Sequence, residues 1–248
     1  IKGVIPTDYA TTLLPHAKSL LEEYDAIRSL RTLAAKSQSA VTIYALDHVF
    51  AYLGASLIED FHEAYPSIIL SVVDTTDAHA IAALASQQCS FAITAGPLDE
   101  TRFEGEPLFF SHYSVRMHRS HPLAKLPALT YDDLDGQTII SKGRAYDCFR
   151  HHIDRYFLAP GRKIHILAET ADESIIRTLL LHNKAINIGY DYADPMYPHP
   201  DIVSRTLKEE ISGQMIYLVS NPQVRKTKAS CLFHDFLLEW MKKKAAIQ

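Results

Sequence analysis

Apolar and small residues recur every three or four positions along the first part of the chain. In order, the recurring positions are Ala10, Leu13, Ala17, Leu20, Tyr24 and Ile27. Steps that alternate between three and four are typical of a heptad seam, along which one helix packs against another. From Tyr9 to about Lys36 there is no glycine, and the single proline, Pro15, lies near the start, where a missing N–H does little harm. This pattern predicts one long helix.

Such a seam needs an apolar partner, and a polar run at residues 36–39 separates it from the rest of the chain. We predict a linker and dimerisation helix over residues 1–38, whose partner is a second copy of the chain. An ordinary surface helix packed on its own domain is the alternative. The residues expected in the dimer contact are Leu13, Ala17, Leu20, Tyr24 and Ile27.

After this helix, short β-rich runs alternate with amphipathic segments. The first series predicts strands over 41–45, 68–73 and 91–94, separated by helices over 50–65 and 78–86. Continuous apolarity predicts that strand 68–73 is buried on both faces, and Asp77 is the expected N-cap of the second helix. A similar second series predicts strands over 137–141, 163–167 and 185–189, with helices over 145–157 and 172–182, the latter capped by Asp172.

The remaining segments connect and close the two series. Residues 107–118 are predicted to cross between them as an extended segment, and 202–206 and 214–219 as strands. A helix over 227–245 carries Leu232, Phe236 and Trp240 on one face. Alternation of this kind indicates an α/β fold with two similar halves. Small ligands usually bind in the cleft between such halves.

Composition narrows the function. The chain has 248 residues, 47% hydrophobic and 22% charged, with a net charge of −4, so it carries no overall electrostatic signature of a nucleic-acid-binding domain. No apolar run reaches the length of a membrane span. The chain begins without Met and without the order of a signal peptide. We therefore expect a truncated cytoplasmic protein, whose DNA-binding part, if it has one, is missing here.

Known catalytic and metal-binding patterns are absent from the sequence. The 3 cysteines form no CxxC pair, and the 13 histidines show no HExxH-type spacing, so neither a disulfide framework nor a metal site is expected. There is no nucleophile elbow, Walker loop or dinucleotide fingerprint. We expect neither enzymatic activity nor a cofactor. A redox switch at Cys148, activated by a helix N-terminus, is a minor alternative.

Four motifs in a fixed order carry a resemblance. They are the Thr7, Ala10, Leu13-Leu14 and Ala17 spacing, then Phe61 with Tyr65-Pro66 and Ile68, then His121-Pro122-Leu123-Ala124, and finally Leu129 to Gly136. Together they resemble the LysR-type family of bacterial transcriptional regulators, from just after the winged helix-turn-helix. The chain departs from the family pattern at Ala10, where glycine is usual, and over 87–93 and 183–189, near the expected cleft.

The resemblance implies a definite architecture. The fold class is α/β, with two Rossmann-like lobes that contain mixed sheets and are joined by two crossover strands, as in type 2 periplasmic binding proteins. Lobe I is expected over about 39–110 and 202–248, and lobe II over about 111–201. Together these make an effector-binding domain over 39–248 that follows the linker helix.

In such a cleft, strand C-termini and helix N-termini converge and offer N–H groups to an anionic ligand. Short hydroxyls can add hydrogen bonds and Lys142 a charge. For Thr75, Thr76 and Thr170, capping of a helix is an equally good explanation. Asp47 indicates a ligand with a donor or cationic group, or caps a helix itself. His48 is a ligand donor or a structural histidine. The expected ligand-binding residues are Asp47, His48, Thr75, Thr76, Thr94, Ser141, Lys142, Thr170 and Tyr190.

The leading hypothesis is therefore the effector-sensing and oligomerising part of a transcription regulator. A polar or anionic metabolite in the cleft would control the binding of promoter DNA by the missing N-terminal domain, and the working assembly would be a homodimer or homotetramer. A solute-binding protein of the same bilobed fold is the alternative, and a size measurement discriminates the two. No membrane partner is expected.

Overall fold

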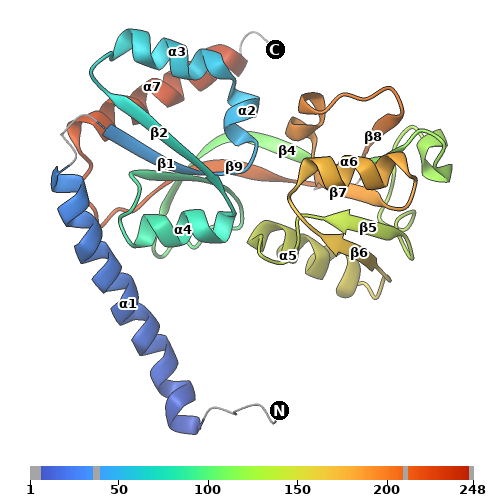
Figure 1. The fold of residues 1–248 in the computed structure, drawn as a ribbon, viewed down its shortest axis with the longest axis horizontal. Helices are drawn as coiled ribbons and strands as arrows, with labels where there is room; N and C mark the ends of the chain where they lie inside the picture. Colours follow the sequence, from blue (N-terminus) through green and yellow to red (C-terminus); the bar gives the residue numbers. More distant parts are fainter. Residues whose placement is uncertain (1–6, 36–39, 209–211, 246–248) are drawn as a thin grey trace.

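The computed structural model describes residues 7–35, 40–208 and 212–245. Its first element is helix α1 (Asp8–Ala35), whose N-terminal part projects away from lobe I (Figure 1), whereas Ala26 in its later part is buried. The Thr7 hydroxyl accepts a hydrogen bond from the Ala10 N–H at 3.2 Å and so begins the helix. The predicted long helix is confirmed over these residues. Its seam is open to solvent, since Leu13 is 47% and Leu20 is 71% exposed; the side chain of Ile27 lies outside the described part.

Lobe I is built on five hydrogen-bonded strands in the order β2-β1-β3-β9-β4. The strands are β1 (Ala40–Leu46), β2 (Ile69–Thr75), β3 (Phe91–Ala95), β9 (Gly213–Ser220) and the first half of β4 (Glu104–His118). Pairing of β1 with β2 and β3 is parallel, whereas β9 is antiparallel to both of its neighbours. One face packs on α2 (Val49–Leu53), α3 (Ala55–Ala64) and α7 (Lys228–Ala245), and the other on α4 (Asp77–Ala85).

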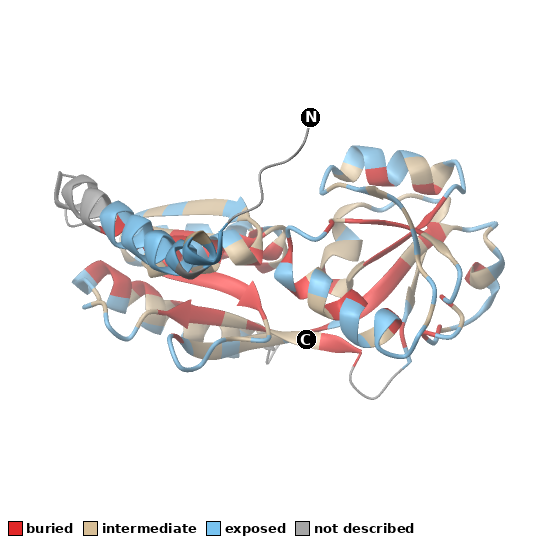
Figure 2. Ribbon diagram, turned by 90° about the horizontal axis from the view of Figure 1, so that it is seen from below, coloured by how far each residue is buried: buried red, intermediate tan, exposed pale blue. Residues whose placement is uncertain are grey.

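Lobe II repeats the plan with the second half of β4. Its other strands are β5 (Thr138–Ser141), β6 (His165–Glu169), β7 (Ile186–Tyr190) and β8 (Ile202–Thr206). The helices are α5 (Asp147–Ile153), continued by one π-helical turn, η2 (Asp154–Leu158), and α6 (Glu173–Leu181); η1 (Pro122–Lys125) and η3 (Asp191–Met196) are short 3-10 turns. Because β4 pairs with β9 up to His112 and with β7 from Tyr113, this strand runs through both lobes. The second predicted crossover, between β8 and β9, includes residues 209–211, which lie outside the described residues. Each lobe has buried residues of its own (Figure 2), and the lobe I cluster continues across the interface to Tyr146, Cys148 and Tyr192 of lobe II.

Three local predictions were wrong. The helix predicted over 50–65 is two helices, because Gly54 has a φ of 94° and breaks the chain between them. Strand β2 is not buried on both faces, because it lies at the sheet edge, where Ile69 is 68% exposed. Asp77 is not the cap of α4, because the Thr76 side chain accepts the hydrogen bond from His79 N–H and Asp77 is the first helical residue.

The lobe boundary also needs correction. The sequence prediction placed 202–248 in lobe I, but β8 pairs with Ser114–His118 of β4 and so extends the lobe II sheet. The chain returns to lobe I only at β9, whose first residue is Gly213. Hydrophobic patterning cannot distinguish these assignments, since both sheets accept a short alternating strand. The closing helix is confirmed, with Leu232, Phe236 and Trp240 packed against the lobe I core.

Candidate functional site

The two lobes meet where β1 and β5 end, and an ion pair joins them there. The Lys142 ammonium group, just after β5, contacts the carboxylate of Asp47, just after β1. The side chains are 21% and 13% exposed, so solvent screens the pair only partly. The Tyr192 hydroxyl of lobe II donates a further bond to the Asp47 carbonyl oxygen at 3.1 Å. Asp47 and Lys142 are both predicted at the cleft from the sequence, and the structure brings them into contact.

His48 lies beside this pair at the start of α2, in a left-handed conformation with a φ of 68°. Its Nε2 atom is 3.4 Å from the Asp47 carboxylate, and its Nδ1 atom is 3.2 Å from the Tyr197 hydroxyl of lobe II. Burial and the neighbouring Lys142 lower the pKa of His48, although Asp47 opposes them. We therefore expect a neutral imidazole at pH 7 that contacts both lobes.

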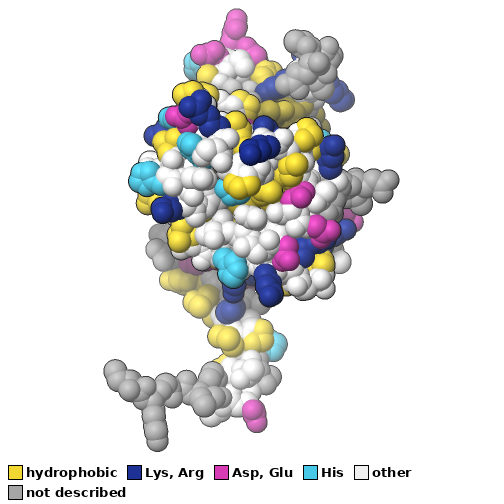
Figure 3. All heavy atoms as spheres, turned by 90° about the vertical axis from the view of Figure 1, so that its right-hand side faces the viewer, with side chains coloured by type: hydrophobic (Ala, Val, Ile, Leu, Met, Phe, Trp, Pro, Cys, Tyr) yellow, Lys and Arg dark blue, Asp and Glu magenta, His cyan; other side chains and the backbone are white. Residues whose placement is uncertain are grey.

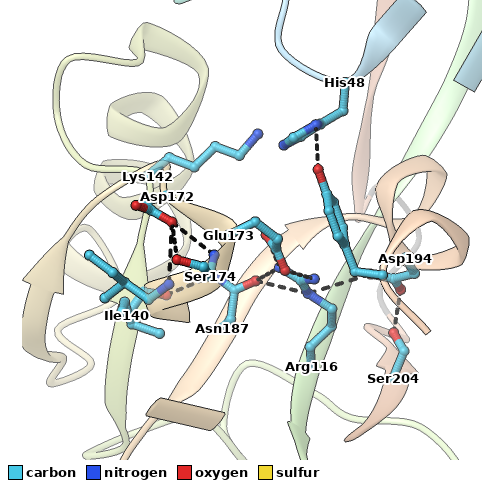
Figure 4. Close-up of polar contacts among 12 residues, drawn as sticks. His48, Arg116, Ile140, Lys142, Asp172, Glu173, Ser174, Asn187, Asp194 and Ser204 are labelled. Atoms are coloured by element: carbon cyan, nitrogen blue, oxygen red, sulfur yellow. Dashed lines mark hydrogen bonds and ion pairs between the residues drawn. The ribbon is translucent and has the colours of Figure 1, made fainter. Parts of the chain in front are cut away.

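A second polar cluster, which the sequence analysis missed, lines the lobe II wall of the cleft (Figure 4). The Arg116 guanidinium group of β4 donates to Glu173 at 2.5 and 3.0 Å and to the Asn187 side-chain oxygen at 2.7 and 3.1 Å. Asp194 lies 3.8 Å from Arg116 and accepts a bond from the Ser204 hydroxyl. Burial raises the pKa of Asp194.

One signal in the sequence could have found this cluster. Arg116 lies between the buried Val115 and Met117, and Asn187 between the buried Ile186 and Ile188. Buried polar side chains need partners, so a polar residue within each of two apolar strand segments indicates that the two meet. Asn187 also donates to the Ile140 carbonyl oxygen at 2.9 Å, which fixes the amide within the sheet.

The predicted hydroxyl residues divide into two groups. The three threonines bond to residues near them in the sequence. The Thr75 hydroxyl lies 2.8 Å from the His79 ring, and the Thr76 hydroxyl accepts the His79 N–H. The Thr170 hydroxyl accepts the Asp172 N–H at 3.0 Å. Ser141 is fully buried at the end of β5, and its hydroxyl has no hydrogen-bond partner within the described residues.

Thr94 is buried in β3 opposite Tyr217, on the same sheet face as Ala92, which packs with α4. The structure therefore does not place Thr94 with the Lys142–Asp47 pair.

Tyr190 lies at the end of β7, as predicted, within a stack of aromatic rings. Its ring stacks on Tyr113 at 5.2 Å and on Tyr192 at 5.6 Å, and its hydroxyl donates to Gln214 at 2.8 Å. Burial raises its pKa well above the usual value. Tyr190 and Lys142 line two small cavities of the cleft, with free volumes for a water-sized sphere of about 30 and 20 Å³. The lobes therefore stand closed on each other.

The lobes are also joined through Asp77, which is 4% exposed at the start of α4 in lobe I. Its carboxylate accepts hydrogen bonds from the Asp147 and Cys148 N–H groups at the start of α5, at 2.9 and 2.6 Å. This arrangement argues against the minor alternative of an activated thiol at Cys148. Burial and Asp77 raise the pKa of Cys148, because a carboxylate occupies the helix end that would have stabilised a thiolate.

Neither a metal-binding cluster nor a membrane-spanning helix is found among the described residues. Over the described residues, no three His, Cys, Asp or Glu side chains are arranged to hold a metal ion. None of the described helices is both long and apolar enough to cross a bilayer. Figure 3 shows the outer end of lobe II, where basic and acidic side chains are interspersed and neither sign dominates. In the cleft, charged side chains of both lobes converge in partly buried surroundings.

A bilobed α/β fold with a polar cleft defines a small-molecule-binding domain, and comparison with known proteins gives its family. The LysR substrate binding domain matches residues 34–242. The chain belongs to this family and is the effector-binding regulatory domain of a LysR-type transcription regulator. This is a family of regulators and not of enzymes.

Individual relatives are distant. The chain is 23% identical over 189 residues to the HTH-type transcriptional regulator CysB of Burkholderia cenocepacia, a match that covers 75% of this chain and 60% of CysB. The chain thus spans about half the length of the curated relatives it matches, from 44% to 60%.

Solved structures confirm the fold. The effector binding domain of QuiR in complex with shikimate has a TM-score of 0.73 at 21% identity, and covers 84% of this chain and 99% of its own. The regulatory domain of Synechocystis PCC6803 CcmR in complex with 2-PG has a TM-score of 0.74 at 15% identity, and covers 82% and 98%. The predicted bilobed architecture after a long helix is therefore confirmed.

Proposed function

We propose that a small polar metabolite binds between the lobes at the Lys142–Asp47 pair and thereby controls the binding of promoter DNA. In this proposal the DNA contacts belong to a domain outside this chain. The regulator acts in the cytoplasm. The observation that supports the proposal is the cross-lobe ion pair itself, because a ligand that competes for Lys142 changes a contact on which lobe closure depends. The QuiR and CcmR domains, which share the fold, are complexes with shikimate and 2-PG.

Competition for Lys142 gives the ligand different affinities for the closed and the rearranged cleft, as a population shift requires. One oxygen of the Asp47 carboxylate, the Nε2 atom of His48 and the Ser141 hydroxyl are buried without a hydrogen-bond partner in the described chain. These atoms offer acceptors and a donor next to Lys142. The proposed ligand therefore carries an acceptor, such as a carboxylate, for Lys142 and a hydroxyl or amino donor for Asp47.

The other predicted residues line the cleft or order the elements around it. Tyr190 forms the floor of the cleft, and Thr170 lies beside Ser141, whose carbonyl oxygen accepts the Thr170 N–H at 2.7 Å. Thr75 and Thr76 order the start of α4 through His79. We assign Thr94 no direct ligand contact.

Isothermal titration with shikimate and benzoate as carboxylate probes tests this proposal. We expect Lys142→Met to weaken the binding of a carboxylate about 10-fold or more, because a partly buried charge-assisted bond is lost. Since that variant leaves Asp47 unpaired, the double variant Asp47→Asn with Lys142→Met keeps the site neutral and checks the fold. Lys184→Met, on an exposed loop of lobe II, is the matched control. Equal affinity of wild type and Lys142→Met for a bound carboxylate would exclude the proposed site.

We further propose that α1 pairs with α1 of a second copy, so that the working assembly is a dimer or a tetramer. The exposed apolar seam supports this, since Leu13 and Leu20 are 47% and 71% exposed. Light scattering should find a dimer or larger, and Leu13→Glu with Leu20→Glu should shift it towards the monomer. A monomeric wild type would reject the pairing of α1 with a second copy.

A further inference from the structure

A second cavity extends from the cleft into lobe II, beneath α5. It is lined mainly by aromatic and aliphatic side chains, and Leu46 of lobe I and Lys142 stand at its cleft end. Its free volume for a water-sized sphere is about 30 Å³ in the closed structure. We call this space the aromatic cavity; its ring-bearing lining residues are Tyr113, Tyr146, Phe149, His152 and Tyr190.

His152 is the unusual member of this lining. It is 0% exposed, and within the described residues neither of its ring nitrogens has a hydrogen-bond partner. The ring of Tyr113 lies beside it, and the two rings meet edge to face at 3.9 Å between centroids. Buried polar groups are nearly always satisfied, so these unpaired nitrogens need an explanation. A ligand that supplies the missing partners is such an explanation.

The chemistry of the cavity selects a neutral group. Burial lowers the pKa of His152 to about 3, so the imidazole is neutral and offers one donor and one acceptor. A carboxylate placed deep in the cavity, beside His152, would lose its hydration, because Lys142 of the lining is already paired with Asp47. A hydroxyl on a flat ring can both donate and accept, and the ring can stack on the aromatic side chains around it.

We propose that the aromatic cavity receives a neutral, hydroxyl-bearing aromatic ring of the effector, with the hydroxyl bonded to His152. This rests on the proposed function of the cleft, and it adds a second half to the ligand: a polar group at Lys142 and a phenol-like ring beneath α5. Lys142 lines both cavities. A ligand that draws Lys142 away from Asp47 therefore also opens the entrance through which the ring passes.

The test compares phenol with toluene, which has the ring and lacks the hydroxyl, by isothermal titration of the whole chain. We expect wild type to bind phenol about five-fold more tightly than toluene, as one hydrogen bond to a buried group implies. His152→Phe keeps a ring of similar shape without nitrogens, and should abolish this preference while toluene still binds. His151→Phe, the neighbouring position on α5, should keep it.

A second measurement reads the contact directly. Phenol should shift the ¹⁵N resonances of the His152 side chain, because its hydroxyl forms a hydrogen bond with the imidazole. Toluene has no hydroxyl and should leave these resonances in place. If His152→Phe does not fold, as judged by circular dichroism, Tyr113→Phe with the same pair of probes replaces it, and phenol should lose part of its preference there. Equal affinity of wild type for phenol and toluene, or a phenol preference that survives His152→Phe, would overturn the inference.

The experiments distinguish failure of the aromatic cavity proposal from failure of the proposed function of the cleft. If carboxylate binding depends on Lys142 while phenol shows no preference over toluene, the cleft proposal stands and the aromatic cavity proposal is rejected. If phenol binding depends on His152 while Lys142→Met leaves carboxylate binding unchanged, the cavity is a binding site and the Lys142 assignment is rejected.

Discussion

The two lobes share a plan of sheet and helices, and both bury polar side chains, but they differ in how these are satisfied. Asp77 of lobe I is hydrogen-bonded across the interface, whereas Ser141 and His152 of lobe II have no hydrogen-bond partner among the described residues. The lobe I core is apolar around Phe233, which meets Phe61 and Phe91 at 5.2 and 6.0 Å between ring centroids. Lobe II buries Ser141, His152 and Asn187 together with an aromatic cavity. Unpaired polar groups cost stability and are kept where they serve binding. The comparison therefore makes lobe I the packed platform and lobe II the side that recognises a ligand.

The largest effect is expected in the platform. Phe233→Ala should lower the free energy of unfolding by about 3–5 kcal/mol, because it leaves a cavity in a close-packed core. Urea denaturation measures this loss. Leu158→Ala, at a position that is 54% exposed, is the control and should change stability by less than about 0.5 kcal/mol. A loss below about 1 kcal/mol for Phe233→Ala would contradict the view of lobe I as a tightly packed platform.

The next effect concerns the contact between the lobes. Asp77→Ala removes the acceptor of two N–H groups at the start of α5, which should disfavour the closed arrangement by about 2–3 kcal/mol. Small-angle X-ray scattering should then show a larger radius of gyration. An unchanged scattering profile would mean that other contacts, such as Lys142–Asp47, hold the lobes without Asp77.

The buried histidine of lobe II should make stability depend on pH. The folded-state pKa of His152 is about 3, below its ordinary value of 6.5, so the unfolded chain binds the proton first as pH falls. Its contribution to stability is complete above pH 6.5 and decreases towards pH 3, by up to about 1.4 kcal/mol per pH unit. Urea denaturation from about pH 7 to about pH 5 should show a flatter profile for His152→Phe. Parallel profiles would show that His152 is not buried as a neutral group.

The smallest effect is a local one within lobe I. Thr76→Ala removes the N-cap of α4 and should cost about 1 kcal/mol of stability. Because Thr76 bonds within its own lobe, its loss should leave the scattering profile unchanged, in contrast to Asp77→Ala. Thermal denaturation with scattering on the same sample compares the two adjacent residues. An expanded Thr76→Ala variant would show that ordering of α4, and not the Asp77 carboxylate alone, holds the lobes together.

Much of the fold was predictable because its determinants are local. The structure confirms three short-range patterns: the periodicity of α1, the alternation of strands and helices, and the Asp172 cap. The four family motifs are also short-range, and the family match over residues 34–242 confirms the resemblance that they carry. The expected cleft residues Asp47, His48, Ser141, Lys142 and Tyr190 end strands or follow them, as predicted. The prediction failed at Gly54 and at β2, where a backbone conformation and a place at the sheet edge decided the outcome.

The sequence by itself therefore determined the class of the protein: a helical linker, two α/β lobes, and a cleft bounded by strand ends. Tertiary structure alone decided which side chains meet, because Lys142 and Asp47 are 95 residues apart, Asp77 and Cys148 are 71 apart, and Arg116 and Asn187 are 71 apart. It also decided that His152 is buried and its neighbour His151 is not. Local patterns fix which face of a helix or strand is apolar. The topology fixes which side chains that face meets, and the binding chemistry depends on these contacts.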